Sequence, residues 1–153
     1  MELFTIAAQL PSLNEYTNAC RSNAYRGGKF KRNVEQTIQN AIMIAKLRKT
    51  LHKVTEPCYV MIEWHESTMR RDADNIHSSV KFILDALQSM DILPNDSRKY
   101  VRQIFQFVVP EKAEKGAYCS VALCNMEEAQ DVMYGWFTRE EQAHGGKADE
   151  KQK

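Results

Sequence analysis

Residues 70–87 read "RRDADNIHSSVKFILDAL" and combine two features around which the rest of the chain can be interpreted. The first is an Asp-x-Asp pair, Asp72 and Asp74, directly after two arginines. The second is an apolar pattern at helical spacing, which predicts a helix from Asp74 to Met90. Aspartates at this place can cap the helix or complement its dipole. Alternatively, the two carboxylates lie on the same side of an extended segment and bind a divalent cation.

The predicted helix has one apolar face and one polar face. Phe82 falls on the polar side near Asp85, where we expect it to be exposed and able to contact a second subunit or DNA. The residues expected on the core side are Ile76, Val80, Ile83, Leu84, Leu87 and Met90.

Apolar patterns elsewhere predict one α+β domain. A second long helix is expected at 29–51, after a polar, loop-like segment at 11–28. The order β-α-β-α-β-β predicts a mixed β-sheet with two main helices packed on one side of it. The last two strands are expected to form a hairpin. The predicted strands are 2–10, 58–65, 100–109 and 117–123.

Length and composition agree with a single globular domain. The chain has 153 residues, of which 43% are hydrophobic. We expect the domain to occupy residues 1–125, followed at 126–153 by an acidic tail with a short helix and a disordered end. No apolar run approaches the length of a membrane span, and the N-terminus lacks the pattern of a secretion signal. The four cysteines include no Cys-x-x-Cys pair and are expected to be reduced thiols of a cytoplasmic protein.

The charge is unevenly distributed along the sequence. Residues 1–125 contain 17 Lys and Arg against 13 Asp and Glu, whereas residues 126–153 contain 4 against 7. Any one basic group can be a solvated surface, but several basic groups around a carboxylate cluster favour a phosphate-bearing partner. The three groups are Arg21, Arg26, Lys29, Lys31 and Arg32; Lys46, Arg48, Lys49 and Lys53; and Arg98, Lys99 and Arg102.

A third carboxylate follows the predicted helix. Asp96 lies in the turn "ILPND" and is followed closely by Arg98 and Lys99. Carboxylates bordered by cations are typical of a metal-dependent site that acts on a phosphate, in which the acids hold the metal and the bases hold the phosphate.

The segment "RRDADNIHSSVKFILDAL", followed by "ILPND", resembles the RusA family of phage and prophage Holliday-junction endonucleases. That family combines Asp-x-Asp-Asn with a helix ending in Asp-Ala-Leu and a further aspartate about eleven residues beyond the helix aspartate. Here Asp85 and Asp96 are eleven residues apart. "LPSLNEY" near the N-terminus is similar to the opening loop of the family, and the resemblance spans roughly residues 5–123.

This resemblance implies that Asp72, Asp74 and Asp96 are catalytic and bind Mg²⁺, or Mn²⁺ in its place. Arg71 matches the basic residue that precedes these aspartates in the catalytic site of the family. The implied activity is a structure-specific endonuclease that resolves four-way (Holliday) junctions in DNA recombination and repair. The basic residues expected to contact DNA are Lys29, Lys31, Arg32, Arg70, Arg98 and Lys99.

Two departures from the family pattern keep alternatives open. The family's catalytic lysine is replaced by Ser78, and we expect Lys81, nearly one helical turn further on, to take its role. Asn95 stands where many members carry another aspartate. A non-catalytic protein that binds branched DNA is one alternative. A metal-dependent, phosphatase-like enzyme is the other, although the chain has no Gly-rich phosphate loop.

Resolving a junction requires two matched nicks, which favours a symmetric homodimer. A helix from Asp74 to Met90 is about 25 Å long, and the six residues that follow reach roughly 20 Å when extended. We therefore predict that Asp96 meets Asp72 and Asp74 of a second copy, with Phe82 at the seam between the two helices.

Overall fold

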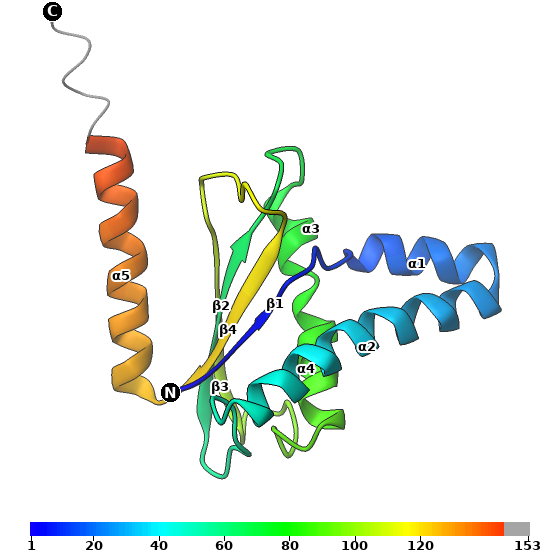
Figure 1. Cartoon of the computed structure of the whole chain (residues 1–153), viewed down its shortest axis with the longest axis horizontal. Helices are drawn as coiled ribbons and strands as arrows, with labels where there is room; N and C mark the ends of the chain where they lie inside the picture. The colour runs from blue at the N-terminus through cyan, green and yellow to red at the C-terminus, as the bar shows by residue number, and fades with distance from the viewer. Residues whose placement is uncertain (146–153) are drawn as a thin grey trace, which may run out of the picture.

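The computed structural model describes residues 1–145, which form one four-stranded mixed sheet with helices on both of its faces (Figure 1). The strand order is β1-β4-β2-β3. β4 is antiparallel to both of its neighbours, while β2 and β3 are parallel. The predicted α+β class, with a mixed sheet in a single domain, is therefore confirmed. The strands are β1 (Glu2–Ile6), β2 (Cys58–His65), β3 (Val101–Val108) and β4 (Tyr118–Cys124).

The predicted hairpin between the last two strands is wrong, because β2 lies between β3 and β4. Trp64 of β2 is paired with Val108 on one side and with Cys119 on the other. The connection 109–117 therefore passes the end of β2 before the chain returns as β4. Alternation of apolar residues predicts that a segment is a strand, but it does not identify the neighbouring strand.

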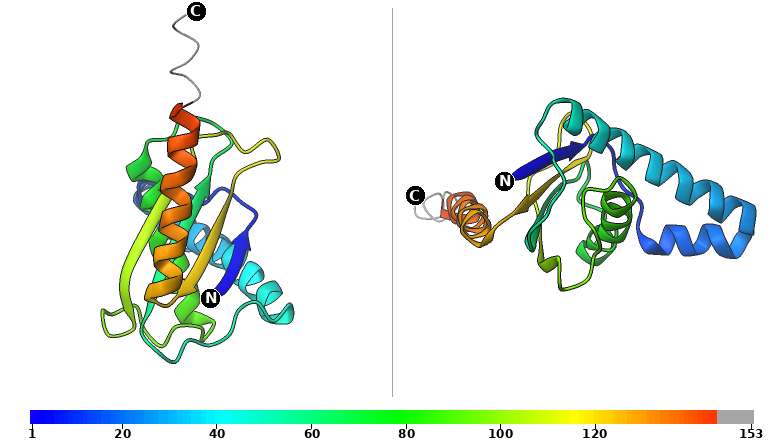
Figure 2. Two further views of the ribbon diagram at one scale, coloured as in Figure 1. Left: turned by 90° about the vertical axis from the view of Figure 1, so that its left-hand side faces the viewer. Right: turned by 90° about the horizontal axis from the view of Figure 1, so that it is seen from below.

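The helices form two layers around the sheet (Figure 2). On one face, Val60 and Ile62 pack with residues of α2 and α4, and on the other face Met61 packs with α5. This alternation along β2 follows from the opposite directions of successive side chains in a strand. The helices are α1 (Leu13–Ser22), α2 (Ala24–Leu47), α3 (Ala73–His77), α4 (Val80–Ser89) and α5 (Met126–Gly145).

The segment predicted to be a loop at 11–28 is mainly helical. Ser12 and Glu15 form a capping box at the start of α1: the Ser12 hydroxyl accepts a hydrogen bond from the Glu15 backbone N–H, and the Glu15 carboxylate accepts one from that of Ser12. A Ser-x-x-Glu pattern marks a helix start. The Ser and Asn content of the segment favours turns, which is the reason for the loop prediction. Packing of α1 on α2 overrides this local preference.

α1 and the first part of α2 project from the body as a helical hairpin, which we call the arm (residues 13–32; Figure 1). At its base, the Tyr16 ring lies 6.0 Å from Phe30 and 5.9 Å from Phe82, between ring centroids. Further out, the two helices approach closely at Gly27, where a Cβ atom would lie 2.6 Å from Cys20 Sγ. The arm therefore depends on a glycine for its helix spacing.

This contact predicts different outcomes for two adjacent glycines. Alanine in a helix is more favourable than glycine by about 0.5–1 kcal/mol. At Gly28 the nearest atom to a new Cβ would be Arg32 Nη1 at 3.7 Å, so we expect Gly28→Ala to increase the free energy of unfolding by that amount. At Gly27 the methyl group would collide with Cys20, and overpacking of about 1–3 kcal/mol should make Gly27→Ala destabilising. Urea unfolding measures both, and an equal gain at the two positions would contradict the close contact.

The helix predicted from Asp74 to Met90 is divided by an elbow at Ser78 and Ser79. Ser79 is fully buried and its hydroxyl donates to the Pro11 carbonyl at 2.8 Å. The Ser78 hydroxyl donates to the Asn75 carbonyl and accepts from the Leu13 N–H at 3.1 Å. Serine side chains that bond to backbone compete with helix hydrogen bonds. The elbow thereby fastens the start of α1 to α3 and α4.

Phe82 is not on the surface, contrary to the prediction. Only 3% of it is exposed, and it meets the Tyr16 ring edge-on. The helix α1, which carries Tyr16, was absent from the prediction, and Tyr16 packs on Phe82. A buried Phe82 leaves no role for this residue at the seam of a dimer.

The helix after Asn125 has twenty residues and is not the short helix predicted. Trp136 is 5% exposed, stacks on Phe107, and donates its indole N–H to Glu63 at 2.7 Å. Arg139 also pairs with Glu63, at 2.7 Å. α5 is therefore packed on the second face of the sheet. The end of the tail that is predicted to be disordered covers residues 140–153. Residues 140–145 are helical instead, and residues 146–153 lie outside the described residues.

The contacts of Glu63 predict a pH-dependent contribution to stability. Burial alone would raise the pKa of this carboxyl, but hydrogen bonds from Arg139 and Trp136 outweigh it and lower the pKa. A carboxyl with a lower pKa in the folded state stabilises at pH values above its unfolded pKa, and this stabilisation is lost as the pH falls through the folded pKa. We expect Glu63→Gln to lower the free energy of unfolding by about 1 kcal/mol at pH 7. The difference should begin to shrink as the pH falls to about 4 and should vanish once the pH is below the folded pKa. Urea titrations across this range measure it, and a difference that persists at low pH would contradict this role.

The four cysteines are free, as predicted, and Cys58, Cys119 and Cys124 are buried. Burial raises the pKa of Cys119 to about 12 and that of Cys124 to about 11, so neither thiol ionises near neutral pH. Across residues 1–145, none of the helices has both the length and the apolar character that a membrane crossing requires.

Candidate functional site

Asp72 and Asp74 lie at the start of α3, and both are exposed. Asp72 occupies the N-cap position with extended backbone angles, yet its side chain makes no capping hydrogen bond. Asp74 lies in the first turn of α3 and not at the cap position, so the alternative in which it caps the helix does not hold. Capping therefore does not account for the pair, and both carboxylates remain accessible to a cation.

Arg71, directly before this pair, is held by acidic residues from two parts of the chain. Its Nη1 lies 3.1 Å from Glu66 Oε1, and its Nη2 lies 3.9 Å from Glu15 Oε2 of α1. Glu66 is only 7% exposed. This buried ion pair fixes the segment that leads into Asp72, which makes Arg71 a supporting residue in the observed conformation.

The base of the arm adjoins the aspartate pair. The Asn14 side-chain amide donates to Asn75 Oδ1 at 3.2 Å, which connects α1 with α3. The bond from the Leu13 N–H to Ser78 lies in the same region. Asp72 and Asp74 are thus placed where the arm meets the body of the protein.

Asp96 lies at the other end of the parallel strands β2 and β3 from this pair. β2 and β3 are parallel, and Asp72 follows the end of β2 whereas Asp96 precedes the start of β3. The paired length between these ends is about 20 Å at the usual rise per residue. Within residues 1–145, no three His, Cys, Asp or Glu side chains are grouped closely enough to bind a metal ion together.

Two carboxylates are nevertheless compatible with Mg²⁺. This ion commonly keeps several waters and binds through one or two protein carboxylates together with oxygens of a substrate phosphate. Asp72 and Asp74, exposed and two residues apart, fit that requirement by donor chemistry. A third carboxylate from Asp96 could come only from a second copy.

The predicted basic residues are divided between the two ends of the sheet. Arg70 is exposed beside Asp72, while Arg98 and Lys99 are exposed beside Asp96. Lys81 is exposed on α4, where its ammonium lies 3.4 Å from Asp85, one turn further from Asp74. To reach a phosphate at Asp74, Lys81 has to leave Asp85.

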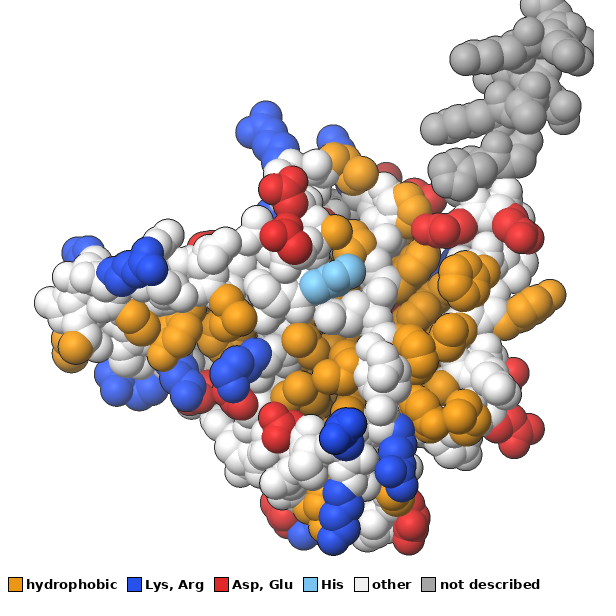
Figure 3. All heavy atoms as spheres, turned by 180° about the vertical axis from the view of Figure 1, so that it is seen from behind, with side chains coloured by type: hydrophobic (Ala, Val, Ile, Leu, Met, Phe, Trp, Pro, Cys, Tyr) orange, Lys and Arg blue, Asp and Glu red, His pale blue; other side chains and the backbone are white. Residues whose placement is uncertain are grey.

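The remaining predicted DNA contacts are on the arm. Lys29 and Arg32 are exposed, and Lys31 lies 3.6 Å from Glu35 on the same helix. Figure 3 shows Lys and Arg side chains distributed along the projecting arm. The arm therefore presents a basic surface away from the sheet.

Two acidic residues near the aspartate pair were not singled out from the sequence. Glu15 has a recognisable local signal, because it completes the Ser-x-x-Glu capping box. Glu66 has none: it follows a strand and looks like an ordinary surface acid. Its burial, its pairing with Arg71 and the hydrogen bond that its backbone carbonyl accepts from the Ala113 N–H are seen only in the folded chain.

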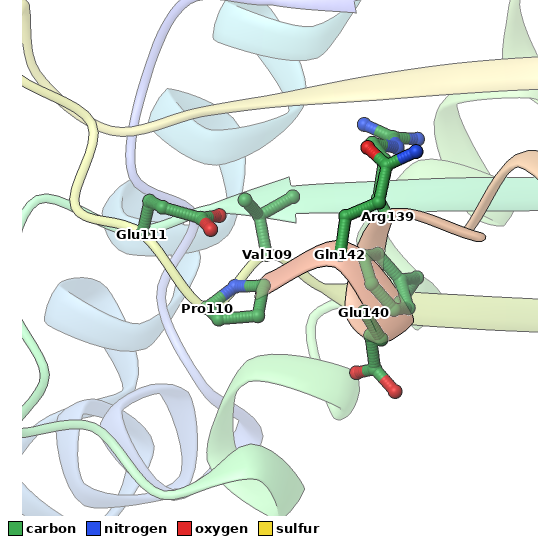
Figure 4. A pocket seen from close by; sticks show the side chains of 7 residues that line it. Val109, Pro110, Glu111, Arg139, Glu140 and Gln142 are labelled. Atoms are coloured by element: carbon green, nitrogen blue, oxygen red, sulfur yellow. The ribbon is translucent and has the colours of Figure 1, made fainter. Parts of the chain in front are cut away.

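A cavity of about 420 Å³ lies on the opposite face of the sheet. Figure 4 shows that Val109, Pro110 and Glu111, which follow β3, face residues of α5 across it. None of the residues predicted to act in the site lines this cavity. Its volume suits a small ligand, but it is remote from the acidic and basic residues described above.

In comparisons with known proteins, the chain matches no protein-family model and no curated protein sequence.

Proposed function

We propose that this protein is a Mg²⁺-dependent endonuclease that acts on branched DNA, with four-way junctions as its substrate. The observation that carries the proposal is the exposed Asp72 and Asp74 pair at the foot of a basic arm. Paired carboxylates beside phosphate-binding cations suit metal-assisted hydrolysis of a phosphodiester. The resemblance of the segment 70–96 to RusA endonucleases supports the same activity.

Asp72 and Asp74 would hold the metal, which when bound supplies charge that polarises the scissile phosphate and lowers the pKa of a water. The Glu66–Arg71 ion pair orients the segment that carries these carboxylates. Arg70 lies at the exposed edge of the site and binds an adjacent phosphate. Lys81, after exchanging Asp85 for the DNA, places its positive charge near the phosphate that becomes more negative during cleavage.

The proposal includes a homodimer, because the paired strands β2 and β3, about 20 Å long, separate Asp96 of one chain from its own aspartate pair. In a two-fold assembly, the Asp96 end of one copy, with Arg98 and Lys99, approaches the Asp72 and Asp74 end of the other. Each of the two sites then has three carboxylates, and the two sites cut opposing strands.

The deciding experiment compares a labelled four-way junction with linear duplexes of the same sequences, in Mg²⁺ and in EDTA. We expect paired nicks in the junction with Mg²⁺, no cleavage in EDTA, and little cleavage of the linear duplexes. A junction that is bound but never cut, in Mg²⁺ or in Mn²⁺, would instead favour the non-catalytic binding protein. Release of phosphate from a simple phosphomonoester without junction cleavage would favour the phosphatase-like alternative.

A further inference from the structure

Tyr25 is an aromatic side chain at the outer end of the arm. It is 70% exposed, although its backbone N–H is fixed by a 2.7 Å hydrogen bond to Asn23 Oδ1 at the start of α2. Tyr16, by contrast, packs against Phe30 and Phe82 at the base of the arm. Tyr25 therefore contributes no packing that would explain a large aromatic residue at this position.

Tyr25 continues a row of cations along α2. Tyr25, Lys29 and Arg32 are separated by four and three residues, which places them on one face of the helix. All three are exposed, whereas Val34 and Ile38 on the opposite face are buried in the core. The row is about 10 Å long. An aromatic ring in line with cations is the combination that binds single-stranded nucleic acid, because bases stack on the ring and phosphates pair with the cations.

The charge around the tip supports a nucleic-acid partner. Residues 21–32 contain five basic residues, Arg21, Arg26, Lys29, Lys31 and Arg32, and no acidic residue. Within a continuous duplex the bases are stacked on one another, so a tyrosine at the tip of a helical hairpin can reach only a base that is unpaired. Branched DNA offers such bases where the strands exchange.

The arm also fixes the distance between this tip and the aspartate pair. The close approach of Gly27 to Cys20 holds the two helices of the arm together, the Tyr16 ring packs against Phe82 of α4, and Asn14 connects the arm to α3. The ten residues of α1 span about 15 Å. At about 3.4 Å per nucleotide along a strand, this length of α1 corresponds to roughly four nucleotides.

From these observations we infer that Tyr25 stacks on an unpaired base of branched DNA while Lys29 and Arg32 bind the adjoining phosphates. The inference rests on the proposed DNA-binding function and adds the feature of the substrate that the arm recognises.

The test measures binding in EDTA, so that the outcome does not depend on cleavage. The probes are a single-stranded oligonucleotide, a four-way junction and a linear duplex, each carrying the fluorescent base 2-aminopurine. Tyr25→Ala and Tyr25→Phe are compared with the wild-type protein. Tyr134→Ala is the matched control, because Tyr134 is 75% exposed but belongs to α5 on the other side of the sheet.

Tyr25→Ala should weaken binding of the single strand and the junction about tenfold. It should also abolish the change in 2-aminopurine fluorescence that accompanies binding of the wild-type protein. The affinity of Tyr25→Ala for the duplex should stay within about twofold of the wild-type affinity. Tyr25→Phe and Tyr134→Ala should bind all three probes within about twofold of the wild-type affinities. Unchanged affinity of Tyr25→Ala, or an equal loss on all three probes, would overturn the inference. A protein that binds junctions through Tyr25 but never cuts them would overturn the proposed nuclease alone.

Discussion

An Asp74→Asn protein is expected to bind a four-way junction and leave it uncut, and mixing it with an equally inactive Asp96→Asn protein is expected to restore cutting. Each substitution removes a proposed metal ligand, so each protein alone should lose all detectable cleavage. Binding should be retained or tightened, because removal of a carboxylate charge also removes its repulsion from DNA phosphates. Asp72→Asn should behave as Asp74→Asn does.

The restoration depends on the positions of the carboxylates in the fold. Because Asp74 and Asp96 of one chain lie at opposite ends of the parallel strands β2 and β3, the proposed site combines them from two chains. In a mixed dimer one site carries both substitutions and the other carries neither. Random exchange of two equal populations gives about half mixed dimers, so cleavage should recover to roughly a quarter of the wild-type sites.

Several outcomes would contradict these assignments. Normal cleavage by Asp74→Asn would exclude the aspartate pair as the metal site. Two inactive variants that stay inactive after mixing would place all three carboxylates in one chain, provided that a wild-type protein mixed with a tagged inactive variant shows subunit exchange. A stable monomer on junction DNA, measured by light scattering, would exclude the homodimer.

Arg71→Ala is expected to be among the most destabilising single substitutions near the site. It leaves the Glu66 carboxylate, 7% exposed, without the cation that lies 3.1 Å from it. Removing one partner of a buried ion pair costs about 3–5 kcal/mol in the free energy of unfolding. Urea unfolding measures this loss. Arg70→Ala is the matched control, because Arg70 is exposed and should change stability by less than about 0.5 kcal/mol while weakening DNA binding.

A double-mutant cycle separates the ion pair from a direct contact between Arg71 and DNA. Combining Glu66→Gln with Arg71→Ala removes the unpaired carboxylate charge, so the double variant should be more stable than Arg71→Ala alone. If Arg71→Ala is as stable as the wild-type protein but binds junctions poorly, then Arg71 contacts phosphate directly.

The sequence by itself was sufficient for the class of the fold and for most of its strands. The strand predicted at 58–65 has the same bounds as β2, and Val60, Ile62 and Trp64 face one core as their alternation predicts. These features are local, because side chains alternate in any strand regardless of its partners. The exposed Asp72 and Asp74 pair was equally visible as a sequence motif.

Only the tertiary structure decided which segments lie next to one another. Three features depend on residues distant in sequence or on an element that was not predicted. They are the position of β2 between β3 and β4, the packing of Tyr16 of α1 on Phe82, and the hydrogen bond from the Ala113 N–H to the backbone carbonyl of Glu66. The separation of Asp96 from Asp72 likewise follows from the parallel pairing of β2 and β3. The spacing of apolar residues predicts whether a segment is a helix or a strand and which of its side chains are buried. The neighbours of that segment are selected by packing among all the elements at once.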